Sequence, residues 1–270
     1  MRIANCFTKA KQENRAALGI FISAGDPDPQ TSLQILLGLP DQGVDFVELG
    51  MPFSDPMADG PVIQASSLRA LKAGMKLDRV LDMAKAFRDR HPETPLILMG
   101  YYNPIYIYGV DRFLARAVEA GVDGMIMVDL PPEEDEEFCV PAMKTGIEMI
   151  RLVTPTTDTA RMPLVLERAG GFVYYVSITG ITGTRSASED SIKSAMERIR
   201  AVSDLPAVVG FGIRTPDQVR EAARHADGVV VGSAVVGAIA GSLDADGKAG
   251  DNTILVVLQQ ANELAQGRYR

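Results

Sequence analysis

The chain has 270 residues, of which 46% are hydrophobic and 23% are charged, a composition typical of a globular protein and too apolar for wholesale disorder. Its formal net charge of -8 argues against nucleic acid as the main partner and against a polybasic membrane anchor. No run of about 20 uninterrupted apolar residues is present, so the sequence predicts no transmembrane helix and a cytoplasmic protein.

The amino-terminal segment 1–19 predicts a short amphipathic helix, because Ile3 and Phe7 stand at helical spacing without the continuous apolar run of a signal peptide. The two cysteines, Cys6 and Cys139, lie far apart and lack CxxC spacing, which favours reduced intracellular thiols over a disulfide framework. The few histidines lack metal-ligand spacing, so no metal site is expected.

Apolar runs and helix-like segments alternate along the chain. Eight runs predict strands: 18–23, 44–49, 96–100, 124–129, 149–153, 172–177, 207–211 and 228–231. Helices are predicted between most of them, at 61–72, 111–120, 133–144, 160–168 and 189–202. Alternation favours parallel pairing. Eight pairs favour one α/β domain over 1–270, a TIM (β/α)8 barrel with an additional N-terminal helix, although a doubly wound open sheet shows much the same rhythm.

Two carboxylates stand out in the segment 48–61, which reads ELGMPFSDPMADGP. Glu48 lies in an apolar run that reads as a buried strand, where a carboxylate is costly unless it is protonated, hydrogen-bonded or used in chemistry. The alternative is a structural carboxylate that backbone donors satisfy. Asp59 follows in a loop stiffened by prolines, and its alternative role is turn formation. Only the fold can bring the two together.

Two glycine motifs follow the last two predicted strands. Gly210-Phe211-Gly212 and Gly232-Ser233 can present backbone N–H groups to an anion, and barrels often bind phosphate with the loops after strands seven and eight. The alternative is tight packing that needs small residues. The segment 177–188 is rich in Gly, Ser and Thr and reads either as an active-site lid or as a flexible surface loop.

The segment 48–61 resembles the signature of tryptophan synthase alpha chains. The resemblance extends over the chain, through Gly25-Asp26-Pro27, Gly180-Ile181-Thr182-Gly183, Gly210-Phe211-Gly212, Pro216-Asp217-Gln218-Val219 and Gly232-Ser233. It implies an eight-stranded barrel that cleaves indole-3-glycerol phosphate to indole and glyceraldehyde 3-phosphate, a retro-aldol reaction. It also implies acid–base catalysis without a cofactor in this chain.

The family motif implies roles for individual residues. Glu48 and Asp59 would be the catalytic pair, with Glu48 handling protons at the bond that breaks and Asp59 near the indole nitrogen. Tyr174 matches the active-site tyrosine, and since Tyr174 and Tyr175 are neighbours on a strand they must point to opposite faces. The expected substrate-binding residues are Phe21, Leu98, Thr182, Gly183, Phe211, Gly212, Gly232 and Ser233.

The resemblance further implies an alpha2beta2 complex in which indole passes to a pyridoxal phosphate-dependent beta chain. Asp55, Pro56, Asn103 and Pro131 match positions at the expected partner face. Two alternatives remain open: a stand-alone lyase that releases free indole, and a catalytically silent barrel that binds a phosphate ligand.

Overall fold

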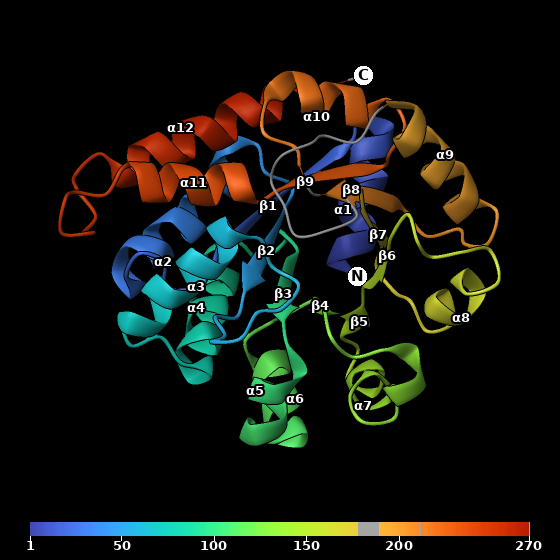
Figure 1. Cartoon of the computed structure of the whole chain (residues 1–270), viewed down its shortest axis with the longest axis horizontal. Helices are drawn as coiled ribbons and strands as arrows, with labels where there is room; N and C mark the ends of the chain where they lie inside the picture. Colours follow the sequence, from blue (N-terminus) through green and yellow to red (C-terminus); the bar gives the residue numbers. More distant parts are fainter. Residues whose placement is uncertain (178–188, 211, 270) are drawn as a thin grey trace.

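The computed structural model describes residues 1–177, 189–210 and 212–269, which form a ring of parallel strands with helices packed around it (Figure 1). The strands are β1 Ala17–Ser23, β2 Phe46–Gly50, β3 Leu96–Gly100, β4 Gly124–Met127, β5 Glu148–Met149, β6 Arg151–Val153, β7 Val173–Val176, β8 Ala207–Gly210 and β9 Gly228–Val231. Their order is β5-β4-β3-β2-β1-β9-β8-β7-β6, with every neighbouring pair parallel.

The α-helices cover the outside of this ring, apart from α1. They are α1 Arg2–Gln12, α2 Pro29–Gly38, α3 Pro61–Lys72, α4 Leu77–Arg90, α5 Tyr102–Tyr108, α6 Val110–Glu119, α7 Cys139–Lys144, α8 Met162–Leu166, α9 Glu189–Arg200, α10 Pro216–Ala223, α11 Ser233–Gly241 and α12 Thr253–Gln266. Two 3-10 turns, η1 Pro40–Gln42 and η2 Pro132–Glu134, complete the described elements. None of these helices is both long and apolar enough to cross a membrane.

The barrel closes through an interrupted strand. The predicted fifth strand is divided at Ile150 into β5, which pairs with β4 from Gly124↔Glu148, and β6, which pairs with β7 from Arg151↔Val173. The same stretch of chain therefore links both ends of the sheet. This pairing confirms the predicted barrel rather than the doubly wound alternative.

Most element boundaries lie close to the prediction, and one helix differs. The predicted 61–72 coincides with α3, whereas the predicted continuous helix 133–144 is divided into η2 and α7. Between these two elements Asp135 is buried and forms an ion pair with Arg151, and Phe138 is buried in the core. These tertiary contacts turn the chain inward where local propensity alone would continue a helix.

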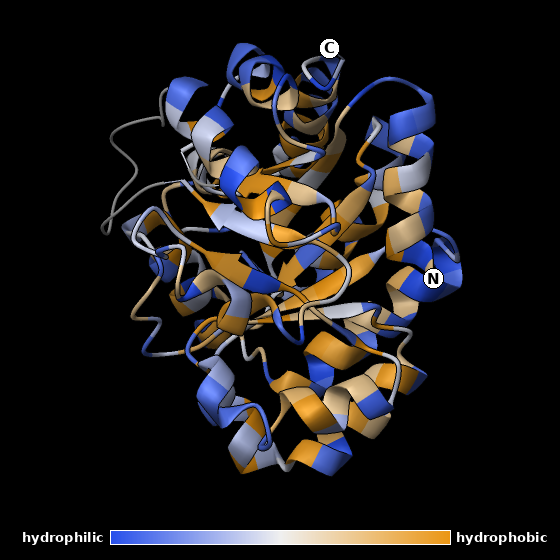
Figure 2. Cartoon of the chain, turned by 90° about the vertical axis from the view of Figure 1, so that its right-hand side faces the viewer, coloured by the Kyte–Doolittle hydropathy of each residue, from blue (hydrophilic) through white to orange (hydrophobic). Residues whose placement is uncertain are grey.

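Two apolar layers hold the barrel together, one inside the ring and one between the strands and the helices. Figure 2 shows that the strands consist mainly of hydrophobic residues. Helix α1 closes the amino-terminal end of the ring, as the expected N-terminal helix, with Ile3 and Phe7 buried. The Phe7 ring lies 5.9 Å from Phe46 and 5.6 Å from Phe172, and these two lie 5.4 Å apart. This aromatic cluster fills the closed end, so a ligand must enter from the other end.

Three aspartates make the same contact at the amino-terminal ends of the strands. Asp45, Asp123 and Asp227 each stand directly before a strand. Their carboxylates accept the backbone N–H of Leu18 at 2.9 Å, Leu96 at 2.8 Å and Ala207 at 3.0 Å. Each is also paired with an arginine: Arg15, Arg88 and Arg200, respectively. We call these contacts the aspartate ties; they join neighbouring strands at the closed end.

Candidate active site

A cavity opens at the carboxyl ends of β1 to β4, the end of a barrel where active sites lie. Its walls come from these strands, from the loop 51–60 and from α3. The lining residues are Phe21, Ser23, Gly50, Met51, Asp59, Ile63, Ser67, Met99, Gly100, Tyr101 and Val128. The structure thus places Asp59 and Phe21, two of the expected site residues, in one wall.

Glu48 lies on the inner face of β2, one layer below this cavity. It is two residues before Gly50, and it faces Phe21 across the β1–β2 ladder. Its side chain is fully buried, and both carboxylate oxygens lack a hydrogen-bond partner among the described residues. Burial raises its pKa to about 8, so Glu48 carries a proton at neutral pH. The alternative of a carboxylate satisfied by backbone donors does not fit this environment.

Asp59 is half-buried in the loop between β2 and α3. Its backbone N–H donates to Pro56 O at 3.0 Å, and its carbonyl oxygen accepts from Gln64 Nε2 at 2.8 Å. Burial raises the pKa of Asp59 to about 6, while a hydrogen bond from the Tyr101 hydroxyl opposes this shift. The Tyr101 hydroxyl also accepts the Ala58 N–H at 3.1 Å. Asp59 is therefore mainly ionised at pH 7, whereas Glu48 is mainly protonated.

Tyr174 points into the barrel and Tyr175 packs in the outer layer, which confirms that they face opposite ways. Burial raises the pKa of Tyr174 well above its ordinary value. At the high pH where this tyrosine would ionise, Glu48 is a carboxylate, and its negative charge raises the pKa of Tyr174 further. A Cβ on Gly210 would lie 2.0 Å from the Tyr174 hydroxyl oxygen. The hydroxyl group therefore occupies space that only glycine leaves free at the end of β8.

The expected aromatic residue near the indole, Phe21, lies between two glycines. A Cβ on Gly50 would come within 2.6 Å of its ring, and a Cβ on Gly232 within 3.3 Å of its own Cβ. Leu98, in contrast, packs in the outer layer and does not line the cavity. Side chains alternate along β3, so its neighbour Met99 takes the inner position. The cavity residue on this strand is therefore Met99, one position after the expected Leu98.

The predicted phosphate motifs lie on adjacent strands. Gly212 follows β8 with a φ of +79°, and Gly232 precedes α11, whose first residue is Ser233. Since β8 and β9 are neighbours, both motifs stand at the same side of the barrel. Thr182, Gly183 and Phe211 lie outside the described residues, as does the predicted lid beyond Ser177.

Sequence reasoning missed Tyr101, Ser23, Ile63 and Ser67, all of which line the cavity. A usable signal existed for Tyr101, because it directly follows a predicted strand and barrels place functional groups there. The other three had no such signal, because a serine or isoleucine in an apolar helix or strand reads as core.

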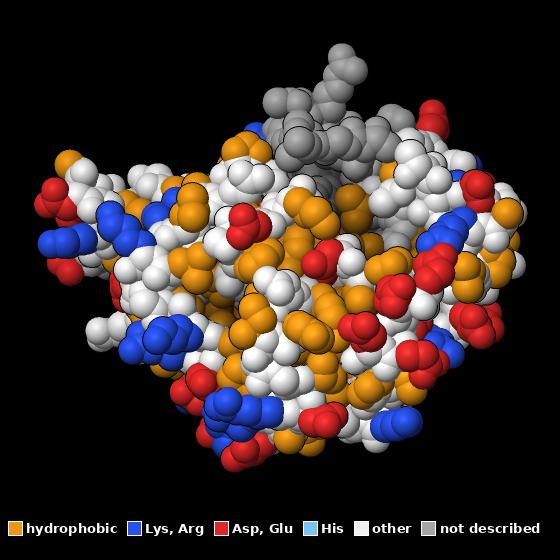
Figure 3. Space-filling model, turned by 60° about the horizontal axis from the view of Figure 1, so that its bottom comes forward, with side chains coloured by type: hydrophobic (Ala, Val, Ile, Leu, Met, Phe, Trp, Pro, Cys, Tyr) orange, Lys and Arg blue, Asp and Glu red, His pale blue; other side chains and the backbone are white. Residues whose placement is uncertain are grey.

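The expected partner face is accessible. Asp55, Asn103 and Pro131 are exposed and Pro56 is half-buried. Hydrophobic side chains gather between charged ones on the face that carries α5, α6 and α7 (Figure 3). The exposed large hydrophobic residues of α5 and of the loop 51–60 include Met57, Tyr106 and Ile107.

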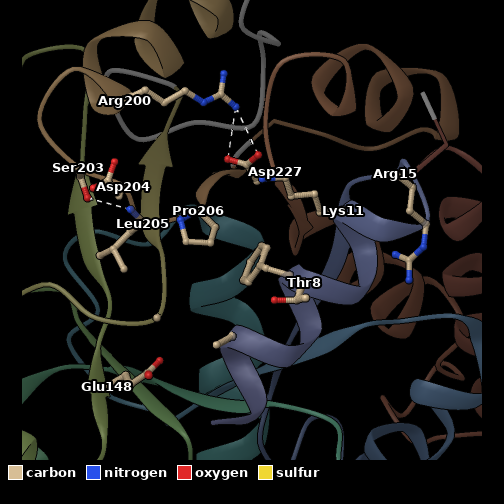
Figure 4. Close-up of a pocket in the computed structure, with 13 residues that line it drawn as sticks. Thr8, Lys11, Arg15, Glu148, Arg200, Ser203, Asp204, Leu205, Pro206 and Asp227 are labelled. Carbon is tan, nitrogen blue, oxygen red and sulfur yellow. Dashed lines mark hydrogen bonds and ion pairs between the residues drawn. The ribbon is translucent and has the colours of Figure 1, made fainter.

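A second pocket lies at the closed end of the barrel, between α1 and the segment 203–206 (Figure 4). Figure 4 shows Thr8 and Lys11 of α1 along one wall and Arg200 bonded to Asp227 above it. Its position is opposite to the cavity that Asp59 lines. In the described part of the chain no group of three His, Cys, Asp or Glu side chains is arranged to hold a metal ion.

Comparison with known proteins agrees with this geometry. The family model described as tryptophan synthase alpha chain matches residues 7–266. Tryptophan synthase subunit alpha from Legionella pneumophila str. Paris is 40% identical, with a TM-score of 0.89 over 98% of this chain and 97% of that chain. A structure from Aquifex aeolicus VF5 is 38% identical, with a TM-score of 0.89 over 100% of this chain and 99% of that one. Mycobacterium tuberculosis tryptophan synthase is 33% identical, with a TM-score of 0.89 over 100% and 98% of the two chains. The chain belongs to the tryptophan synthase alpha chain family.

Proposed function

We propose that Glu48 and Asp59 carry the family reaction, with Tyr174 beside them. As an alpha chain of tryptophan synthase the protein is a carbon–carbon lyase, which cleaves indole-3-glycerol phosphate to indole and glyceraldehyde 3-phosphate in tryptophan synthesis. The observation that carries our assignment is the pair of unpartnered Glu48 oxygens, buried below the cavity that Asp59 lines. A buried carboxyl group with no partner is suited to exchange protons with a substrate.

Glu48 acts as a proton shuttle. Cleavage needs a proton at indole C3 and the removal of a proton from the hydroxyl group of the adjacent glycerol carbon. Protonated Glu48 gives its proton to C3, and the resulting carboxylate takes the hydroxyl proton as the carbon–carbon bond breaks and the aldehyde forms. Glu48 is protonated again at the end of the cycle, so the proton count balances. A group with a pKa of about 8 can act in both directions near neutral pH.

Asp59 stabilises the charge that this proton transfer creates. Protonation at C3 places positive charge on the indole ring nitrogen, and an ionised carboxylate facing the N–H group lowers the energy of that state. With a pKa of about 6, Asp59 is ionised at pH 7 while it remains half-buried. The two acids thus take different roles because their environments separate their pKa values.

The remaining expected residues bind the substrate. Phe21 packs against the indole ring, and Met99 takes the position beside it that the sequence assigned to Leu98. Gly212 after β8, together with Gly232 and Ser233 at the start of α11, holds the phosphate through backbone N–H groups. We assign Thr182, Gly183 and Phe211 to the closed loop and the phosphate on the family motif alone.

We further propose that the chain works with a beta chain in an alpha2beta2 complex through the face that includes Asp55, Pro56, Asn103 and Pro131. Pyridoxal phosphate belongs to that beta chain, and we assign no cofactor to this one. The exposed hydrophobic residues on this face support an interface. A cytoplasmic location stays a prediction, supported by two free cysteines.

Indole release from indole-3-glycerol phosphate by the purified chain tests the proposal, measured with and without a beta chain. We expect slow release that the beta chain accelerates, and a loss of roughly 100-fold or more in Glu48→Gln and Asp59→Asn. Fast release that the beta chain leaves unchanged would identify a stand-alone lyase. Substrate binding without release would identify the silent barrel and contradict the proposal.

A further inference from the structure

The place of Asp59 in the cavity depends on α3, which begins two residues later at Pro61. The buried residues of this helix are small or polar: Ser66, Ser67 and Ala70. Its larger apolar side chains toward the barrel, Val62 and Ile63, are only partly buried. Small side chains leave a smooth contact, so apolar packing alone leaves the position of α3 along β1 weakly defined.

Two polar contacts define that position instead. The Ser66 hydroxyl donates to Ile63 O at 2.7 Å, so in the 2.5 Å contact between the two serine hydroxyls Ser23 is the donor. One turn later, Arg69 Nε and Nη2 donate to the two carboxylate oxygens of Asp26, at 2.7 and 2.8 Å. Asp26 is fully buried in the turn after β1. A planar, two-bond contact sets both the distance and the rotation of the helix relative to β1.

A shift of α3 is transmitted to Asp59 through short connections. Gln64 Nε2 donates to Asp59 O at 2.8 Å, and the N–H groups of Ile63 and Gln64 both donate to Gly60 O at 3.0 Å. The first turn of the helix and the Asp59 backbone therefore move together. Ile63 and Ser67 line the same cavity as Asp59, so a displaced helix also alters the cavity wall.

Stability alone is a weak reason for this ion pair. The Asp26 side chain is fully buried and that of Arg69 is 24% exposed, so the cost of removing charge from water offsets much of their attraction. Such an ion pair often adds little to stability and more to a defined geometry. Burial raises the pKa of Asp26 even though Arg69 opposes the shift, which agrees with a costly site for the carboxylate.

We propose that Arg69, through its two-bond contact with Asp26, is a positioning residue that fixes α3 on β1 and thereby holds the Asp59 carboxylate at its working place in the cavity. This inference rests on the role proposed for Asp59. Arg69 does not line the cavity, so it acts through Asp59 rather than on the substrate.

Arg69→Lys tests the inference, because lysine keeps the charge beside Asp26 and loses the planar two-bond geometry. We expect kcat for indole release to fall about tenfold, with KM within about twofold, since a misplacement of about 1 Å can cost up to about 100-fold in rate. Arg116→Lys is the matched control. Arg116 pairs with Asp78 and Asp82 between α4 and α6 and does not line the cavity, so this variant should keep the rate.

A double-mutant cycle separates positioning from general damage. In an Asp59→Asn background, Arg69→Lys should change the residual rate less than twofold, because the group that it positions is already lost. A full tenfold loss in that background, or no loss in the single variant, would overturn the inference. A loss that only follows the unfolded fraction in a thermal melt would do so as well.

Amide hydrogen exchange gives a readout that does not need residual activity. Arg69→Lys should speed exchange at Asp59, whose N–H donates to Pro56 O, and leave exchange along β3 unchanged. Unchanged exchange at Asp59 would contradict the inference.

If Arg69→Lys does not fold, the paired variant Asp26→Asn with Arg69→Met leaves no unpaired buried charge and takes its place. Should Asp59→Asn itself retain full activity, the role of Asp59 is wrong, whatever Arg69 does.

Discussion

At the scale of single residues, burial alone raises the pKa of Glu48, and the same burial makes the stability of the fold depend on pH. Its pKa is about 8 in the folded chain and 4.5 in an unfolded one, so the folded state binds the extra proton between these values. Stability therefore falls as pH rises from about 4.5 to about 8.

Glu48→Gln removes the carboxyl group that loses its proton, and with it the loss of stability at high pH. We expect the variant to be more stable than the parent by roughly 1–3 kcal/mol at pH 8, below the roughly 5 kcal/mol of a full shift because structure and water relax around the charge. The difference should vanish near pH 4. Urea unfolding at several pH values measures it, with the exposed Glu119→Gln as the control. A constant difference across pH would contradict this account.

The two acids together predict a bell-shaped dependence of kcat/KM on pH, because kcat/KM reports groups of the free enzyme. Asp59 must be ionised and Glu48 protonated, so the rate should rise through about 6, the pKa of Asp59, and fall through about 8, the pKa of Glu48. Tyr101→Phe removes a hydrogen bond that lowers the pKa of Asp59, so the acid limb should move to higher pH while the alkaline limb stays. An acid limb that stays in place would exclude Asp59 as its source.

The glycine opposite Tyr174 predicts a separate effect. Gly210→Ala places a methyl group where the tyrosine hydroxyl lies, so Tyr174 must move. We expect a fall in kcat of about tenfold or more and a loss of roughly 1–3 kcal/mol in stability, from steady-state rates and thermal unfolding. Gly237→Ala is the control, since in the described part of the chain nothing outside the helix's own backbone lies within 4 Å of its added Cβ, and alanine favours the helix. Equal effects of the two changes would contradict this interpretation.

Sequence could single out Glu48 and Asp59 as candidates, and it could not identify several of the neighbours that line the cavity. Glu48 stands out because a carboxylate is rare in an apolar strand. Leu98 and Met99 could not be told apart, because β3 is buried on both faces and its apolar residues show no alternation. The inward side of such a strand follows from its pairing with neighbours.

At the scale of elements, each strand lay near a predicted apolar run, because buried parallel strands leave a continuous apolar signature. Helix ends depended on tertiary contacts, as the ion pair of Asp135 with Arg151 shows. The aspartate ties could not be predicted either. An aspartate before a strand reads as a loop residue until its partner strand is known.

Removal of the Asp123 carboxylate should lower the free energy of unfolding more than removal of an exposed aspartate. Asp123→Ala leaves the Leu96 N–H and the Arg88 guanidinium without their carboxylate partner. We expect a loss of roughly 2–4 kcal/mol in the free energy of unfolding, with kcat of the folded fraction unchanged. Denaturant unfolding and activity measure the two quantities. Asp89→Ala, which breaks an exposed pair with Lys85, should cost less than about 1 kcal/mol. If Asp123→Ala lowered the free energy of unfolding by no more than Asp89→Ala, the aspartate tie would not be needed for stability.

At the scale of the whole molecule, the number of alternating units favoured a closed barrel, but periodicity alone could not exclude an open sheet. Eight alternating units produce the same rhythm in both, and closure depends on whether the two ends of the sheet meet. They meet through residues 148–153, which carry no distinctive composition. The resemblance to a family of barrels supplied that choice, and the pairing of β5 and β6 confirms it.

The interruption at Ile150 leaves a break in the ladder of strand pairing around the barrel. On either side of Ile150 the chain is laddered to one neighbour only, β4 before it and β7 after it, while the rest of the ring is paired on both sides. A backbone hydrogen bond from Gly170 N–H to Met149 O at 2.8 Å joins the two sides there in place of a continuous ladder. We expect local opening of the barrel to begin between β5 and β6. Such opening would move β7 and Tyr174 outward, while Glu48 and Phe21 stay paired in the ladder between β1 and β2. We expect such an opening to widen the barrel on the Tyr174 side while the pairing of Glu48 with Phe21 stays intact.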